Sequence, residues 1–216
     1  MVIKKPPLIT SIRNPLVRKL KSLCSKEGRK EYSLMLLEGT HLLEEALKTK
    51  FSPKDIYATN DWLQRHLEIV RDLPNNIKLQ EVTKSVLDAA LTTVSPDGVA
   101  SLFPISSLPK LNKEPSYILA LDRIQDPGNL GSLFRTALAA DIEIVWLSSG
   151  VDPLNQKVLR ASAGAVLHLP YKRFEDSLVS SSELLSENLK TSIAKGYQVV
   201  ATVVPDPTNS NSIAPY

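Results

Sequence analysis

Apolar and polar positions follow two different periods in residues 30–103. Short, nearly continuous apolar runs are typical of buried strands, and an apolar stripe every three or four positions is typical of an amphipathic helix. Because the two patterns alternate, we expect this part of the chain to form a small α/β layer. The predicted strands are residues 33–39, 55–59, 77–82 and 98–103, and the predicted helices are 40–50, with Thr40 as its N-cap, and 83–91.

Residues 104–115 interrupt this alternation. Three prolines stand there among Ser, Asn and Lys, a composition that supports neither a helix nor a central strand. We therefore predict a semi-rigid linker between two domains, residues 1–103 and 116–216. A length of 216 residues is compatible with two small domains.

The second half of the chain restarts the alternation with more strongly apolar strands. Strands that are apolar on both faces are typical of a parallel sheet covered by helices. The predicted fold class is therefore α/β, with an open, parallel, Rossmann-like sheet in the second domain. Its predicted strands are 116–122, 143–149, 166–171 and 197–204; a turn is expected at 125–131, and helices at 133–142 and up to about residue 195.

The composition excludes several classes of protein. Hydrophobic residues make up 43% and charged residues 23%, as in an ordinary globular protein. No apolar run approaches the ~18 residues of a membrane span, and no signal peptide is recognised, so we expect a cytoplasmic protein without a membrane partner. The single cysteine, Cys24, fits a reducing compartment, and the three histidines lack metal-ligand spacing, so no metal site is expected.

Positive charge is concentrated at the beginning of the chain. Residues 1–30 contain nine basic side chains and one acid, Glu27, whereas the whole chain has a net charge of only +3. A basic helix in front of the first domain is typical of polyanion binding, but it is also compatible with a solvated helix face. The candidate contacts to such a polyanion in this segment are Arg13, Lys19, Lys21 and Arg29.

Candidate chemistry lies in the segment after the strand 116–122, because ligands of open α/β sheets bind beyond the carboxyl ends of the strands. Gly128 and Gly131 would allow a tight turn before a helix whose free N–H groups could bind an anion, but glycines in a strand-to-helix turn are usually structural. Arg135, one turn into the helix, could point back over this loop or form a surface ion pair. The segment matches neither the dinucleotide-binding nor the P-loop fingerprint.

A second loop follows the strand 143–149. Asp152 and Pro153 are expected to begin a turn, and Asn155 to cap a short helix. The small residues 161–165 would suit the close approach of a ligand or a second chain, or simply close helix packing.

These two segments carry a resemblance to a known family. The pattern N-L-G-x-x-x-R-T-A from Asn129, followed by K-V-x-R-A-S-A-G-A from Lys157, closely resembles the SpoU (TrmH-like) family of SPOUT-class RNA 2′-O-ribose methyltransferases. The first half, with E-G-T-H-L-L-E-E-A-L from Glu38, resembles that family's ribosomal-protein-like substrate-binding domain. The resemblance extends from about Ile9 to Val204.

The resemblance implies methyl transfer from S-adenosylmethionine to a ribose 2′-hydroxyl of rRNA or tRNA by a homodimer that binds structured RNA. Asn129 and Arg135 fall on the family's catalytic motif. A guanidinium stays protonated, so Arg135 is expected to clamp a phosphate and stabilise the developing oxyanion, with Asn129 orienting it or the ribose. Arg160 and Ser162 are weaker candidates for contact with RNA or the partner subunit, and Thr202 for contact with the methyl donor.

The chain also departs from the family's pattern. The G-N-E-x-x-G and S-L-N-V-type segments, which form the donor-binding knot, are not present up to Tyr216. We therefore expect the main donor site to lie beyond Tyr216, in a longer protein of which this is a fragment. The alternative is a truncated, non-catalytic RNA-binding protein of the same fold. A dinucleotide-dependent oxidoreductase is disfavoured because its fingerprint is missing.

Overall fold

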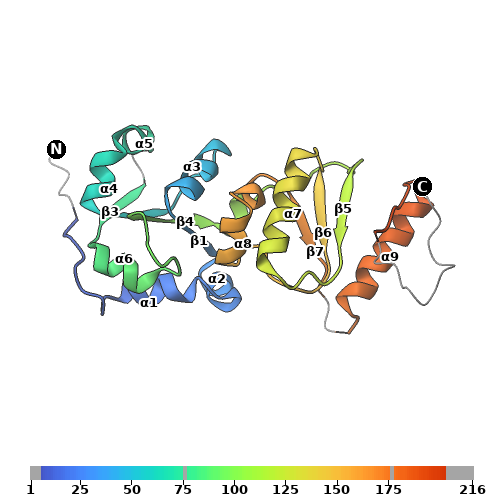
Figure 1. Cartoon of the computed structure of the whole chain (residues 1–216), viewed down its shortest axis with the longest axis horizontal. Helices are drawn as coiled ribbons and strands as arrows, with labels where there is room; N and C mark the ends of the chain where they lie inside the picture. Colours follow the sequence, from blue (N-terminus) through green and yellow to red (C-terminus); the bar gives the residue numbers. More distant parts are fainter. Residues whose placement is uncertain (1–5, 75–76, 176–177, 203–216) are drawn as a thin grey trace.

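Two sheets lie side by side in the computed structural model of the chain, which describes residues 6–74, 77–175 and 178–202 (Figure 1). The N-terminal sheet has the order β1-β4-β2-β3, in which β4 is antiparallel to both of its neighbours and β2 is parallel to β3. The four strands predicted in this half are confirmed. Their bounds are β1 (Leu34–Glu38), β2 (Asp55–Ala58), β3 (Lys78–Glu81) and β4 (Val99–Pro104).

Helices cover both faces of this sheet (Figure 1). Every residue of β1 is buried, and alternate positions point to opposite faces: Leu34 and Leu36 join the core under α1 and α6, whereas Met35 and Leu37 join the core under α3 and α4. The helices are α1 (Pro15–Ser22), α2 (Lys26–Tyr32), α3 (Thr40–Lys48), α4 (Asn60–Arg65), α5 (Leu67–Asp72) and α6 (Lys84–Ala90).

Three local features of this half differ from the prediction. The basic segment forms two helices instead of one, because Ser25 accepts a hydrogen bond from Gly28 and starts α2 anew. Thr40 is the first residue of α3 and not its cap: its N–H donates to the Asp97 carboxylate at 2.7 Å. The sequence does not predict the short helices α4 and α5. Both are mostly polar, and each has one buried residue, Trp62 in α4 and Ile69 in α5, so neither has a recognisable apolar stripe.

The second sheet is parallel, with the order β5-β6-β7, and this part of the α/β prediction is confirmed. Its strands are β5 (Ile118–Leu121), β6 (Ile144–Leu147) and β7 (Tyr171–Arg173). The helices that follow are α7 (Pro127–Ala139), α8 (Gln156–Ala161) and α9 (Ser181–Ala194), the last beginning with a capping box between Ser180 and Glu183. Between the two sheets, residues 104–115 contain one short 3-10 helix, η1 (Ile105–Ser107).

Two of the predicted strands in this half are wrong. Residues 165–167 form a 3-10 helix, η2 (Ala165–Leu167), after the left-handed Gly164, and β7 begins only at Tyr171, so His168 is not in a strand. A short apolar run does not distinguish a strand from another buried segment. Residues 197–202 form no strand, and Val199 and Val200 are exposed instead of paired; residues 203–204 of that prediction lie outside the described residues.

The expected turn at 125–131 is also wrong, because helix α7 already begins at Pro127. Proline suits the first position of a helix, and Asp126 supplies the N-cap by accepting a hydrogen bond from the Asn129 N–H at 2.7 Å. Gly128 and Gly131 are therefore helical. Within the described part of the chain, no helix is both long enough and apolar enough to cross a membrane.

Candidate functional site

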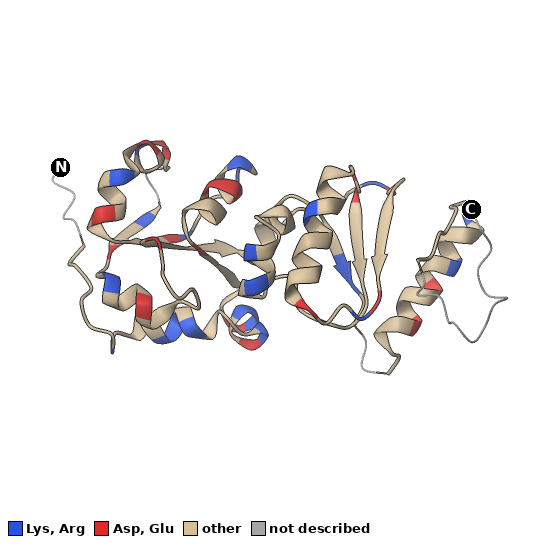
Figure 2. Cartoon of the chain, in the orientation of Figure 1, with Lys and Arg blue, Asp and Glu red and all other residues tan. Residues whose placement is uncertain are grey.

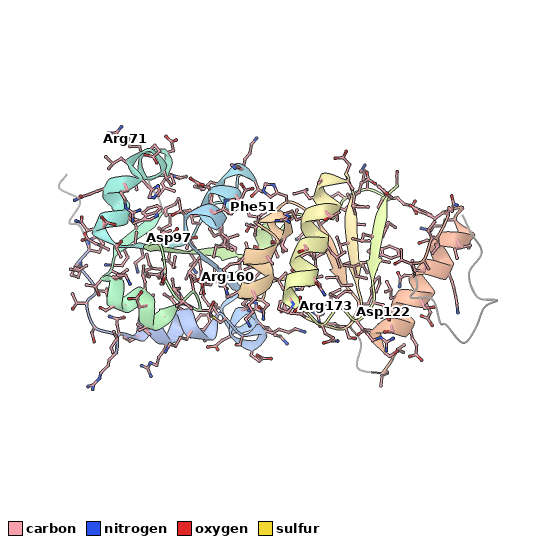
Figure 3. All side chains as sticks on the ribbon, in the orientation of Figure 1. Phe51, Arg71, Asp97, Asp122, Arg160 and Arg173 are labelled. Carbon is pink, nitrogen blue, oxygen red and sulfur yellow. The ribbon has the colours of Figure 1, made fainter. Side chains whose placement is uncertain are left out.

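The carboxyl ends of β5, β6 and β7 bring polar side chains together at one edge of the parallel sheet (Figure 3). Asp122, directly after β5, accepts hydrogen bonds at 2.6 Å from Ser148 after β6 and from Ser182 in α9. Those two hydroxyl groups, with the adjacent Arg123 guanidinium, lower the pKa of the Asp122 carboxyl. Arg173 at the end of β7 donates to the carbonyl oxygens of Gly150 and Val151, so the loop after β6 is held in place.

Helix α7 begins at this edge and contains the two residues predicted to be catalytic. Both Asn129 and Arg135 are exposed. Among the described residues, neither side chain forms a hydrogen bond or an ion pair with another part of the chain. Six positions of an α-helix separate them by roughly 120° around the axis, and the exposed Ser132 lies between them. An amide and a guanidinium on one exposed helix face can contact the same ligand.

The buried face of α7 explains the second glycine of the motif. A Cβ atom at Gly131 would lie 2.5 Å from the Cβ of Ala161 and 2.7 Å from the nitrogen of Ser162. Gly131 is thus required for the close approach of α7 to α8, and the small residues of the 161–165 segment serve helix packing here. The predicted cap of α8 is confirmed, since Asn155 accepts a hydrogen bond from the Lys157 N–H.

The basic segment presents several cations to solvent on α1 and α2 (Figure 2). Arg13 and Lys21 are exposed, as predicted for RNA contacts. Lys19 is only partly exposed, because its ammonium group lies over the Tyr32 ring and 3.9 Å from Asp55. The further exposed cations of α1 and α2 that were not singled out from the sequence are Arg18, Lys26 and Lys30.

Two residues predicted to contact RNA are buried, which contradicts that role for them. Arg29 is 4% exposed; it donates to the carbonyl of Leu23 and forms a 2.7 Å ion pair with Asp152. Ser162 is fully buried, and its hydroxyl donates to the carbonyl of Leu159. A charge count does not reveal either burial, because it contains no information about tertiary partners.

Arg160, another candidate, is exposed but is held by internal contacts. Its Nη1 atom lies 3.1 Å from a carboxylate oxygen of Glu38 and donates to the hydroxyl groups of Thr92 and Thr93. A cleft of about 260 Å³ opens beside it, and Figure 3 labels Arg160 and Asp97 on its border. Apart from Arg160, the residues that line this cleft lie between Glu38 and Asp97, so it is not at the carboxyl edge of β5–β7.

The remaining candidates have simpler surroundings. Thr202, the last described residue, is exposed. His168 lies 2.8 Å from Glu45, and its hydrogen bond, together with that of Lys48, lowers the pKa of the Glu45 carboxyl. His66 stacks on Trp62, and the ring of His41 lies 3.3 Å from the carbonyl of Ala163. Within residues 6–74, 77–175 and 178–202, no group of three His, Cys, Asp or Glu side chains could hold a metal ion.

Two protein families match this chain. Residues 14–101 match the MRM3-like substrate binding domain, and residues 116–213 match the SpoU rRNA Methylase family. An uncharacterised tRNA/rRNA methyltransferase of Synechocystis is 37% identical over 198 residues, which are 90% of this chain and 69% of the relative.

Similarity extends to a protein with a specified reaction and to a solved structure. The 23S rRNA (guanosine(2553)-2′-O)-methyltransferase RlmP of Bacillus subtilis is 34% identical over 76% of this chain and 64% of its own length. The chain thus spans about two thirds of the length of both relatives. An AdoMet-bound rRNA methyltransferase from Sinorhizobium meliloti superposes with a TM-score of 0.63 and 28% identity, covering 77% of this chain and 64% of that one.

Proposed function

The chain belongs to the SpoU rRNA methylase family, a family of AdoMet-dependent RNA methyltransferases, and from this premise we propose that it takes part in 2′-O-methylation of ribosomal or transfer RNA. The observation that carries the proposal is the pair Asn129 and Arg135 on the exposed face of α7, beside the carboxyl edge of the parallel sheet. Their side chains are not engaged by other described residues and are therefore available to an RNA ligand.

The proposed roles follow from the chemistry of the two side chains. S-adenosylmethionine would supply the methyl group. As the ribose 2′-oxygen forms its bond to the methyl carbon, the bond from that carbon to the sulfonium sulfur breaks, a neutral thioether leaves, and the 2′-hydroxyl proton passes to solvent. Arg135 would bind the adjacent phosphate and stabilise negative charge as it develops on that oxygen, because a guanidinium remains protonated and is a poor base. Asn129 would orient the ribose or the Arg135 side chain. The donor itself would be bound partly near Thr202.

RNA would be held first by the N-terminal domain. We assign RNA binding to residues 1–103, methyl transfer to residues 116–216, and the connection to residues 104–115. The exposed cations Arg13, just before α1, and Lys21 of α1, with the partly exposed Lys19, support this division because they concentrate positive charge at the start of the N-terminal domain. Phosphate contacts of this kind position RNA without reading its sequence.

Two finer proposals concern assembly and compartment. We propose a homodimer, and light scattering on the purified protein should give twice the chain mass. We propose a cytoplasmic location because Cys24 is a free thiol, which fits a reducing compartment. Fractionation of cells that express a tagged protein tests the second proposal.

The decisive experiment replaces Arg135 and follows transfer of a labelled methyl group from S-adenosylmethionine to RNA. Arg135→Ala should lower the single-turnover rate by about a hundredfold or more, the usual effect of removing one donor to a developing oxyanion. Arg71→Ala, which removes an exposed guanidinium of α5, is the matched control and should keep the wild-type rate. Wild-type transfer by Arg135→Ala would reject the proposed role of this arginine. RNA binding by the wild type without any binding of the donor would favour the non-catalytic alternative.

A further inference from the structure

Residues 150–170, here called the docking segment, lie between β6 and β7 of the second sheet. They pack against the first sheet and its helices α1 to α6, here called the N-terminal unit. Leu154, Val158 and Val166 of this segment belong to the same hydrophobic core as Met35 and Leu37 of β1. Figure 1 shows α8, the helix of this segment, between the two sheets. The two units therefore share one apolar core instead of being joined by residues 104–115 alone.

Polar contacts fix the docking segment at several points as well. The buried Gln156 donates to the backbone carbonyl of Leu36 in β1 at 2.9 Å. Arg29 of α2 forms its ion pair with Asp152 at the beginning of the segment, and His168 near its end lies 2.8 Å from Glu45 of α3. Contacts distributed along the whole segment restrict rotation of one unit against the other.

Among these polar contacts, the ion pair between Arg160 and Glu38 contains the most deeply buried charged group, the Glu38 carboxylate. The side chain of Glu38 is 1% exposed, and its carboxylate accepts hydrogen bonds from the backbone N–H and hydroxyl groups of Thr92 and Thr93. The Arg160 guanidinium completes this set at 3.1 Å. Removing one partner of a buried ion pair leaves the other charge uncompensated, so the geometry of this pair is strongly constrained.

A second side of α8 contacts the helix that carries the candidate catalytic residues. Ala161, the neighbour of Arg160, packs directly against Gly131 of α7. One short helix is thus in contact with β1 of the N-terminal unit through Arg160 and with α7 through Ala161. A shift of α8 would change the position of Asn129 and Arg135 relative to RNA held on α1 and α2.

We propose that Arg160 is a positioning residue for methyl transfer: by its ion pair with Glu38 it fixes the N-terminal unit against α7, so that RNA bound to the one reaches the other in a single orientation. This inference rests on the function proposed above. It replaces the expectation that Arg160 contacts RNA directly, because Nη1 of its guanidinium is already bonded to Glu38, Thr92 and Thr93.

The test compares Arg160→Gln with Lys157→Gln in the full chain. Lys157 is an exposed cation on the same helix, so both variants lose one positive charge. Three quantities are measured: the dissociation constant for RNA, the single-turnover rate of methyl transfer at saturating RNA, and amide hydrogen exchange in residues 34–38 and 156–161 without RNA.

For Arg160→Gln we expect the transfer rate to fall by about tenfold to a hundredfold, since small misplacement of reacting groups has effects of this size. Hydrogen exchange in both segments should become faster, and the RNA dissociation constant should change less than about twofold, because the loss of one cation is small for a surface with many phosphate contacts.

Arg160→Lys should recover part of the transfer rate, and Glu38→Gln, which keeps the shape of the side chain, should lower the transfer rate as Arg160→Gln does. Lys157→Gln should match the wild type in all three measurements.

Other results would overturn the inference. An unchanged transfer rate and exchange pattern in Arg160→Gln would show that the ion pair does not position the units. Weaker RNA binding with unchanged exchange would make Arg160 a direct RNA contact. An inactive wild type would reject the proposed function and the positioning role together, whereas an active wild type with an equally active Arg160→Gln variant would reject the positioning role alone.

Discussion

Gly131 illustrates how one residue of the motif serves packing instead of a ligand turn. Because a Cβ atom there would lie 2.5 Å from Ala161, even Gly131→Ala forces α7 away from α8. We expect a loss of about 1–3 kcal/mol in the free energy of unfolding, the usual cost of overpacking, measured by urea denaturation. Ser132→Ala, at the next and exposed position, is the control and should leave the free energy of unfolding nearly unchanged. A fully stable Gly131→Ala would contradict the close packing of the two helices.

Asp122 gives a prediction for the pH dependence of stability. Hydrogen bonds from Ser148 and Ser182 lower its pKa in the folded state. A carboxyl with a lowered pKa stabilises the fold above its ordinary range, about pH 4, and loses this contribution as the pH falls through the folded-state value. Asp122→Asn should therefore lower Tm at neutral pH and make Tm less dependent on pH between about 4 and 2.

The size of this effect is limited because the Asp122 side chain is 40% exposed and solvent screens its partners. Asp72→Asn, which removes an exposed carboxylate of α5, is the control and should leave the acid limb of the Tm profile unchanged. If Tm of Asp122→Asn fell below pH 4 in the same way as Tm of the wild type, the hydrogen bonds from Ser148 and Ser182 to Asp122 would not contribute to stability.

The resemblance of the N-L-G-x-x-x-R-T-A segment to the family's motif led to Asn129 and Arg135 as candidates, and the structure adds that both are exposed on one helix face. The expectation of RNA contact failed at Arg29, which came from the charge pattern, and at Ser162, which came from the second motif, because both are buried. Arg29 is one of nine basic residues in its segment, but its ion pair with Asp152 joins positions 123 apart in the sequence. A pattern of local charge contains no such partner, so it does not separate a buried cation from one that faces RNA.

At the scale of elements, helix α7 begins at Pro127, inside the segment 125–131 that the sequence predicts to be a turn. The sequence Asp126-Pro127-Gly128 is typical of a turn, but the same residues supply an N-cap and a first-turn proline. Replacing the cap by Asp126→Ala should cost about 1 kcal/mol in the free energy of unfolding and fray the turn that contains Asn129.

Asp126→Asn is the matched variant, because its amide oxygen can accept the same hydrogen bond from the Asn129 N–H. We expect Asp126→Asn to retain most of the stability and the transfer rate, whereas Asp126→Ala should lower both. Thermal unfolding and the single-turnover assay check the two effects. Equal behaviour of the two variants would mean that the cap does not stabilise this turn.

The same scale shows which elements were predictable. In the first sheet, β1 and β4 are apolar runs next to a break, and burial of all of β1 makes that signal strong, whereas the mostly polar β3 carries a weaker signal. Residues 166–171 gave the same signal, but only Tyr171 belongs to a strand. The left-handed Gly164 is followed by η2, and His168 contacts Glu45 of α3. Conversely, α4 was missed because one buried Trp62 anchors an otherwise polar helix. Tertiary contacts decide these cases.

At the scale of the whole molecule, charge is distributed unevenly over the two units. The exposed cations of α1 and α2 lie on the N-terminal unit, while the candidate catalytic residues lie on α7 of the other (Figures 1 and 2). The shared core and the ion pairs of the docking segment connect these two surfaces. RNA binding and methyl transfer should therefore be separable by mutation, since the first depends on the positive surface and the second on α7.

Salt dependence tests this separation directly. Replacing four exposed cations of the segment, Arg13, Arg18, Lys21 and Lys30, with Gln should weaken RNA binding and make it less sensitive to salt. The slope of log affinity against log salt concentration should become less negative by about 0.7–0.9 for each phosphate that the variant no longer binds. The single-turnover rate at saturating RNA should change little, because Asn129 and Arg135 remain in place.

The matched control removes the same number of exposed cations elsewhere, namely Lys54, Arg71, Lys110 and Lys190. If RNA binding depends on a localised surface, this control keeps the wild-type slope although its net charge is equal to that of the first variant. Equal slopes for the two variants would mean that RNA responds only to net charge, and α1 and α2 would then present a solvated helix face without a specific role. Since counterions are released only where phosphates are bound, the difference between the two slopes measures how many of the bound phosphates lie on α1 and α2.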